Sequence, residues 1–344
     1  MADEVVKKNK RKSKNANNSV KLSKGELKRQ SVLLIFSAIF VIYGIVFYYL
    51  PIAGWVMAFQ NFKLKTGFFH SKFVGLEKFA FMFEPQVFVD RLKETHKLFG
   101  TIIYYVENVA FVRIIRNTLC MGILNLATSF IFAIIFAILL NEVKSKLGKK
   151  LVQTISYLPH FLSMIIVTGI VRDTLSSSGI INELLMNLHI IDRSYDFFAH
   201  QGWFWPIVAI SNLWKETGWN AIIYLAAITA IDPSLYEAAE IDGAGRFGKM
   251  RYITLPGIAP TIMILLVMNI GNVLNAGFEI QYLLGNGLVQ RVSQTIDIYV
   301  LNYGISKSDY SLGTAAGIFK SLVAIVLIVI ANTIAKKSGQ ESLF

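Results

Sequence analysis

The chain has 344 residues, of which 54% are hydrophobic and only 16% are charged, and its mean hydropathy is +0.52. A soluble domain carries roughly 25% charged residues, whereas here the apolar residues form blocks of about 20, the length that spans a hydrocarbon core. The net charge of +12 would suit a nucleic-acid-binding protein, but ten of the 34 Lys+Arg lie before residue 30. The composition therefore predicts a multispanning membrane protein and speaks against nucleic-acid binding.

The basic N-terminal segment, residues 1–30, is expected to be a cytoplasmic tail. It is too long for the basic region of a signal peptide, and no small-residue cleavage site follows Leu50, so the first apolar block should remain as an anchor. The single cysteine, Cys120, lies inside an apolar run and excludes an internal disulfide. We interpret its thiol as a small packing group.

The apolar blocks predict an all-α membrane protein with six transmembrane helices, over residues 32–50, 118–140, 156–171, 203–231, 258–278 and 312–335. Pro51 follows the first, and Asn117 or Thr118 could cap the start of the second. Polar side chains interrupt the later spans: Asn212, Lys215, Glu216, Thr217 and Asn220 in the fourth, Asn269, Asn272 and Asn275 in the fifth, and Lys320 in the sixth.

The distribution of Lys and Arg orients these spans. With the N-terminus inside, the inner segments carry 19 Lys+Arg, and the two short outer segments, 172–202 and 279–311, carry 4. The outer segment 52–117 holds 9, but loops of about 60 residues count little in this rule. Both termini and the segment 232–257 are therefore predicted to be cytoplasmic.

Polar side chains within the spans need partners, because an unpaired amide or charge in hydrocarbon costs a few kcal/mol. A single asparagine often only joins two neighbouring helices. The set in the fourth and fifth spans is too large for that explanation alone, and we interpret it as the lining of a polar pathway. Lys215 and Glu216 could instead lie near the outer interface, where their cost would be small.

The cytoplasmic segment 232–257 has the pattern of two short helices. Asp232 and Pro233 mark a helix start, and Ser234 and Glu237 match a capping box. Gly243 is expected to end this first helix just after residue 242, because glycine adopts the left-handed conformation cheaply.

The second helix should run from Arg246 to Ile253, with Pro256 stopping it before the fifth span. Residues 243–248 match G-x-G-x-x-G, and 243–250 nearly match a P-loop. Both motifs require a preceding strand, and Met250 lacks the hydroxyl that a P-loop uses for Mg²⁺. The segment is therefore not predicted to bind nucleotide, and ATP must be handled by another subunit.

The same segment carries the pattern E-A-A-x3-G-x9-I-x-L-P, formed by Glu237, Ala238, Ala239, Gly243, Ile253, Leu255 and Pro256. It resembles the signature loop of binding-protein-dependent ABC importer permeases, whose type I fold would cover residues 31–340. The resemblance implies that the loop docks as a coupling helix into a cleft of a separate ATPase subunit. Glu237 would pair with a basic group there, Ala238 and Ala239 would pack in the cleft, and the chain would be non-catalytic and free of cofactors and metals.

Residues 152–161 and 272–279 resemble the carbohydrate branch of this family, which is similar to maltose-type permeases and is associated with complex oligosaccharides. This resemblance implies a second homologous permease in a heterodimer, and a lipid-anchored solute-binding protein that delivers the sugar. The outer segment 52–117 would meet that protein, or its aromatic residues would lie along the membrane surface. The candidate pathway residues are Asn272, Asn275, Phe278, Glu279, Tyr282, Trp219 and Asn220.

Three other classes of protein fit the sequence less well. An ion-coupled secondary transporter, the main alternative, would have interrupted helices, but only Glu216 and Glu279 could serve as coupling carboxylates and the cytoplasmic pattern would go unexplained. A membrane enzyme is disfavoured because the five histidines lack metal-ligand spacing. A scaffold would not need polar residues inside its spans.

Overall fold

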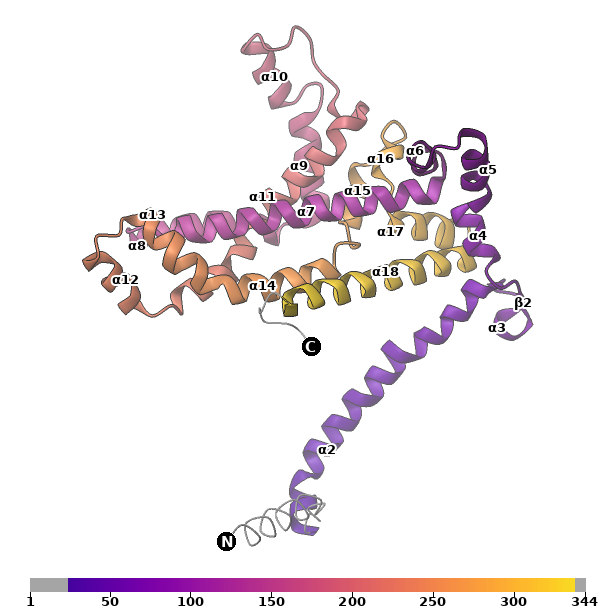
Figure 1. Ribbon diagram of the computed structural model, residues 1–344, viewed down its shortest axis with the longest axis horizontal. Helices are drawn as coiled ribbons and strands as arrows, with labels where there is room; N and C mark the ends of the chain where they lie inside the picture. Colours follow the sequence, from indigo (N-terminus) through magenta and orange to yellow (C-terminus); the bar gives the residue numbers. More distant parts are fainter. Residues whose placement is uncertain (1–23, 338–344) are drawn as a thin grey trace. The chain divides into compact units, whose positions relative to one another are not determined.

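The structure, a computed structural model, describes residues 24–337 and is mainly helical (Figure 1). It divides into two units, Met1–Trp55 and Val56–Phe344. The predicted basic tail lies outside the described residues except for its last part, which forms the start of α2. The first unit contains α2 (Lys24–Gly44), the π-helical turn η2 (Ile45–Tyr49) and the beginning of the 3-10 helix η3 (Leu50–Phe59).

The second unit holds the remaining elements. Its first part, after η3, contains β1 (Gln60–Asn61), α3 (Gly67–His70), β2 (Lys72–Phe73), α4 (Glu77–Phe83), α5 (Pro85–Thr95), α6 (Leu98–Asn108), α7 (Ala110–Asn141), α8 (Lys146–Tyr157), η4 (Leu158–Phe161), α9 (Met164–Leu175) and α10 (Ile180–Asn187). Its second part contains η5 (Phe197–Ala199), α11 (Gln201–Thr229), α12 (Pro233–Ile241), α13 (Arg246–Lys249), η6 (Met250–Thr254), α14 (Leu255–Gly271), α15 (Phe278–Leu284), α16 (Gln290–Ser293), α17 (Ile296–Tyr299), η7 (Val300–Ser306) and α18 (Tyr310–Lys337).

Within the described residues, five helical segments are long and apolar enough to cross a membrane, and a sixth results if α11 and α12, bent by 70°, count as one span. The five are Leu33–Phe59, Ala110–Asn141, Met164–Asn187, Arg246–Gly271 and Tyr310–Lys337. This agrees with the predicted all-α membrane architecture, although several boundaries differ from the sequence-based ones.

Two prolines lie inside continuous helical segments, although Pro256 is predicted to end the helix before the fifth span. The first span continues past Pro51 to Phe59, and Pro256 lies inside the continuous helical segment Arg246–Gly271. In both places a π-helical turn, η2 or η6, comes just before the proline. A proline lacks an N–H and its ring clashes with the carbonyl one turn earlier, so a locally widened turn lets the helix continue.

The second span begins earlier than predicted. Asn117 and Thr118 do not cap α7, which starts at Ala110, and both are fully buried inside it. The Asn117 amide donates to the carbonyls of Arg291 and Gln294 at 2.9 and 3.1 Å. The Thr118 hydroxyl accepts from the Ile296 amide at 3.0 Å. These side chains therefore attach α7 to a segment more than 170 positions further along the chain.

The third span also has a different start. The 3-10 turn η4, with Pro159 in it, interrupts the predicted segment, and the Ser163 side chain caps α9 by accepting from the Ile166 amide. An apolar segment then runs from Met164 to Asn187. A proline and a serine N-cap mark where a helix begins or ends, and a hydropathy average does not take these signals into account.

The fourth span is one continuous helix although polar residues interrupt its sequence, and the helix of the fifth span ends earlier than predicted. α11 runs without interruption through all its polar residues, and the side chains of Asn212 and Lys215 find partners on neighbouring elements. The fifth span instead ends at Gly271, and residues 272–277 are non-helical before α15 begins. The helix of the fifth span therefore ends next to the polar side chains of Asn212 and Asn220 on α11.

Small residues let the central helices pack closely, as is usual between helices in membranes. Figure 1 shows α7, α14 and α18 running along one another, with α12 and α13 at one end and α16 and α17 toward the other. A Cβ atom at Gly122 would overlap the Val273 carbonyl, and one at Gly218 would overlap the Ser156 carbonyl. Ala133, Ala137 and Ala221 are buried in the cluster between α7, α11 and α14.

The outer segment of the second unit is folded rather than a plain loop. Phe59 packs on Phe79 at 5.7 Å between ring centroids, and Phe62 packs on Phe68 and Tyr310. Phe73, on β2, is exposed. Phe59 and Phe62, two aromatic residues of this segment, are thus half-buried packing groups.

We expect Asn117→Leu to reduce the free energy of unfolding by about 1–3 kcal/mol, because two carbonyls inside the protein lose their donor. The measurement is the melting temperature of the purified protein in detergent. Asn108→Leu is the matched control, since the exposed Asn108 amide donates only to the Tyr104 carbonyl of its own helix. Equal melting temperatures for the two variants would refute this role for Asn117.

Candidate functional site

The cytoplasmic helix α12 begins with an aspartate cap. The Asp232 carboxylate accepts from the Ser234 amide at 2.9 Å, and this hydrogen bond lowers the pKa of the carboxyl. The predicted capping box of Ser234 and Glu237 is therefore not the cap that forms. Glu237 is exposed and, among the described residues, has no hydrogen bond or ion pair.

Gly243 ends α12 as predicted, in a Schellman motif. Its φ is +78°, its amide donates to the Glu240 carbonyl at 3.1 Å, and the Ala244 amide donates to the Ala239 carbonyl at 2.8 Å. These two bonds satisfy the last carbonyls of the helix. The Lys249 ammonium contacts the Glu240 carboxylate at 2.8 Å, which lowers the pKa of Glu240 and holds α13 against α12.

The surface of this loop is unusually apolar for a segment outside the spans. Ile241 is 88% exposed, and Phe247 and Tyr252 are each 74% exposed. Ala238 is exposed and Ala239 is half-buried beside them. Exposed apolar groups that gather around a small-residue helix mark a surface for contact with another protein. Of the other predicted coupling residues, Ile253, Leu255 and Pro256 lie in the helical segment that leads from the loop into the fifth span.

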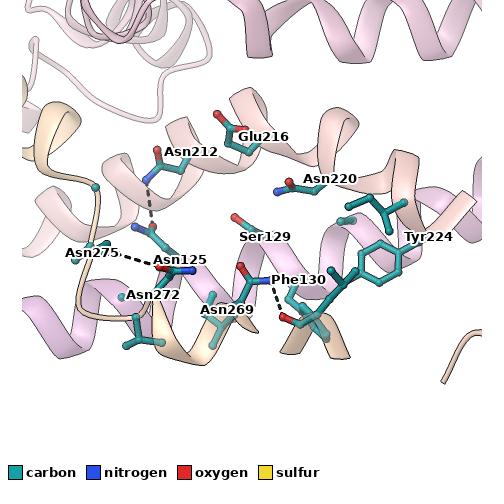
Figure 2. A pocket seen from close by; sticks show the side chains of 18 residues that line it. Asn125, Ser129, Phe130, Asn212, Glu216, Asn220, Tyr224, Asn269, Asn272 and Asn275 are labelled. Carbon is teal, nitrogen blue, oxygen red and sulfur yellow. Dashed lines mark hydrogen bonds between the residues drawn. The ribbon is translucent and has the colours of Figure 1, made fainter. Parts of the chain in front are cut away.

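A polar pocket of about 290 Å³ lies between α7, α11 and the end of α14. Figure 2 shows its labelled side chains converging from these elements. Six asparagines line it together with Ser129, Glu216 and Tyr224: Asn125, Asn212, Asn220, Asn269, Asn272 and Asn275. A cavity of this size with several convergent polar groups is the expected form of a small-molecule binding site.

The asparagines are partly used by the protein and partly free. Asn212 donates to the Asn125 amide oxygen at 3.3 Å, and Asn275 donates to that of Asn272 at 3.1 Å (Figure 2). In the described part of the chain, no hydrogen bond involves the side chains of Asn220 and Ser129. The pocket can therefore both donate to and accept from a bound polar molecule.

Glu216 belongs to a half-buried ion-pair cluster at the edge of this pocket. Its carboxylate lies 3.1 Å from the Lys215 ammonium and 2.8 Å from the His160 Nδ1 atom. Lys215 is only 7% exposed and also donates to the His160 carbonyl at 2.6 Å. The Trp219 ring stacks on the His160 ring at 4.3 Å with an interplanar angle of 1°. Lys215 thus has its partners inside the protein, in the middle of α11.

The structure brings together three of the seven predicted pathway residues. Asn220, Asn272 and Asn275 line the pocket. Trp219 stacks on His160 and does not line the pocket. The other three predicted residues, which also do not line it, lie on α15: Phe278, Glu279 and Tyr282. Their role in a pathway stays a prediction.

Sequence reasoning missed the contributions of α7 and of Tyr224 on α11. Asn125 and Ser129 line the pocket from α7, and Tyr224 lines it from α11. The signal that could have found the first two is their spacing of one helical turn, which places them on one face of an otherwise apolar helix.

Comparisons with known proteins agree on one family. Residues 129–339 match the family described as binding-protein-dependent transport system inner membrane component. Protein LplB of Bacillus subtilis (strain 168) is 40% identical over 319 residues, which cover 92% of each chain. The polygalacturonan/rhamnogalacturonan transport system permease protein YteP of the same organism is 40% identical over 305 residues, 88% of this chain and 87% of YteP.

A solved structure is also similar along most of the chain. It is a crystal structure of the bacterial alginate ABC transporter in complex with an alginate pentasaccharide-bound periplasmic protein. One of its chains is 35% identical to this protein with a TM-score of 0.79, and the match covers 93% of this chain and 99% of that one.

We expect Gly243→Ala to destabilise the turn after α12 by about 1–2 kcal/mol, since an L residue is strained in the left-handed region. Hydrogen exchange of the peptide over residues 233–250 should become faster. Gly245→Ala is the matched control, because space is open around both glycines but Gly245 has a φ of −71°. Identical exchange in the two variants would contradict the proposed strain.

Proposed function

Because this chain belongs to the family of binding-protein-dependent transport system inner membrane components, we propose that it is a permease subunit of an ATP-driven importer that moves an oligosaccharide across the bacterial plasma membrane. A solute-binding protein, lipid-anchored outside the cell, delivers the sugar. The chain itself is non-catalytic, and a separate ATPase subunit hydrolyses ATP. Residues 31–340 form the permease domain, and residues 1–30 form its cytoplasmic tail.

The coupling part of this proposal is carried by the cytoplasmic loop, residues 232–257. Glu237 is free because Asp232 supplies the helix cap, and the same loop exposes the apolar side chains of Ile241 and Phe247. An unpaired carboxylate within an apolar patch suits a cleft that offers a basic group and apolar walls. We assign the occupant of this surface as the ATPase subunit.

The loop is joined to the pocket by two continuous helices. α11 carries Asn212 and Asn220 and leads to the Asp232 cap, whereas α14 starts from the loop and ends beside Asn272. Displacement of α12 by a closing ATPase would therefore move both walls of the pocket. ATP binding would favour one of two states, as a ligand-driven population shift requires.

The cargo assignment rests on the polar pocket. Amide groups that donate and accept are suited to the hydroxyl groups of a sugar, and the relatives named above include transporters of polysaccharide fragments. A pocket formed by one chain at a bundle surface also fits a second, homologous permease that completes it. We propose a heterodimer of permeases in which this chain supplies the asparagine-rich wall.

We expect Glu237→Arg to weaken association with the ATPase by about 2 kcal/mol or more, the effect of a hot-spot residue. The tagged chain should still insert and co-purify with the second permease, while the ATPase is lost. Glu183→Arg, an exposed charge reversal on α10, should retain the ATPase. Normal uptake by Glu237→Arg with the ATPase still bound would overturn the coupling assignment.

We expect Asn275→Leu to reduce oligosaccharide uptake about fivefold, since one hydrogen bond contributes about 1 kcal/mol. The assay measures uptake from a panel of labelled tetrasaccharides, both neutral (arabinotetraose and maltotetraose) and acidic (tetragalacturonate), by the assembled transporter. Asn187→Leu, at an exposed position of α10, controls for surface polarity. Unchanged transport by Asn275→Leu would remove this residue from the pathway.

A further inference from the structure

A second polar pocket, of about 250 Å³, lies at the C-terminal end of α15, where α16, α17 and η7 meet it. Five carboxamide side chains, a hydroxyl group and a phenol ring are among its lining groups: Gln281, Asn286, Gln290, Gln294, Asn302, Ser293 and Tyr282. None of these residues belongs to the first pocket. The pocket lies in the outer segment between the fifth and sixth spans, on the side that faces the solute-binding protein.

Much of the hydrogen-bonding capacity in this second pocket is unused. Gln281 is 0% exposed, and its Oε1 atom has no partner within the described residues. The side chains of Gln290, Gln294 and Asn302 likewise make no hydrogen bond in the part of the chain that the structure describes. The three unpaired amides of Gln290, Gln294 and Asn302 line the pocket, and each can donate to and accept from a bound ligand.

The chemistry of the lining selects an uncharged ligand. Among the described residues that line the pocket, none carries a charge, so an anion or a cation would be desolvated there without a counter-ion. Amides of glutamine and asparagine both donate and accept, which matches a ring bearing several hydroxyl groups. The exposed Tyr282 ring adds an apolar face at the rim.

Gln281 forms the wall between the two pockets. Its Nε2 atom donates to the carbonyl of Ala276, which lines the first pocket, while Gln281 itself is among the residues that line the second. α15 spans seven residues, which corresponds to about 10 Å of helix. A chain of sugar units that leaves the second pocket therefore has a short path to the first.

We propose that the second pocket is an outer saccharide subsite, which holds one neutral sugar unit of the cargo before the cargo enters the asparagine-lined pocket. This inference rests on the proposed function. Asn286 keeps the subsite open by fixing the loop beside it: its amide donates to the Phe198 carbonyl and accepts from the Leu288 and Val289 amides. Gly285 permits close packing there, because a Cβ atom would meet the Gln281 carbonyl at 2.7 Å.

The single cysteine makes a direct test possible. In a Cys120→Ala background, Gln294→Cys and Asn302→Cys each place a thiol in the second pocket, Asn275→Cys places one in the first, and Ser177→Cys places one on an exposed outer turn. The assembled transporter, with its ATPase and second permease, is labelled from outside with a charged methanethiosulfonate. The added sugar is the tetrasaccharide of the uptake panel that the transporter imports.

At a saccharide concentration of about ten times the dissociation constant, labelling of Gln294→Cys and Asn302→Cys should slow about tenfold, because bound sugar leaves few pockets free. Labelling of Ser177→Cys should not change. If the sugar is imported and protects Asn275→Cys but neither thiol of the second pocket, the outer subsite is refuted and the proposed function stands.

Two other outcomes also decide the question. Protection of both second-pocket thiols by the binding protein alone, without sugar, would show that a protein loop fills the pocket, and this would overturn the proposal. If nothing in the panel is imported and no thiol is protected, the saccharide importer assignment fails and the subsite fails with it.

Discussion

Polar groups enclosed by apolar helices must form hydrogen bonds or ion pairs with one another, because leaving them unpaired in an apolar surrounding is costly. This constraint determines how the central helices of the chain are arranged. Lys215 is buried in α11 and is tolerated because Glu216 lies 3.1 Å away. Lys320 in α18 is similarly paired with Asp297 at 2.6 Å. Asn117 satisfies two backbone carbonyls of the outer segment. The Asn117 bonds and the hydrogen bond from Lys215 to the His160 carbonyl join elements that are far apart in sequence, so polar side chains help to determine which apolar helices become neighbours.

Close packing and the break in the fifth span follow from the same requirement. Gly122 lets α7 touch the backbone of the segment 272–277, and this segment presents its polar groups to α7 and α11 instead of to lipid. Gly277 then turns the chain with a φ of +81° before α15 begins. Irregular backbone at membrane depth is tolerated where it lines a polar cavity. The break thus creates one wall of the first pocket and positions α15, whose far end lines the second.

The two ends of this arrangement differ in the kind of partner that they suit. At the cytoplasmic end, α12 carries a free carboxylate among exposed apolar side chains, a combination suited to a protein cleft. Toward the outer end, the two pockets offer amides and hydroxyl groups, suited to a polyhydroxylated solute. α11 and α14 connect them as continuous rods. A permease of this design can transmit a displacement without carrying out chemistry itself.

The sequence by itself determined the membrane class, the approximate positions of the spans, the short helix α12 and the turn at Gly243, because hydropathy, capping and glycine punctuation act over neighbouring residues. It also singled out Asn220, Asn272 and Asn275 as polar residues inside spans. Only the tertiary structure decided that these three share a pocket with Asn125, while other candidates turn elsewhere. The reason is physical: the partner of a polar side chain, and the neighbour that leaves room only for a glycine, come from distant parts of the chain, and local patterns do not encode them.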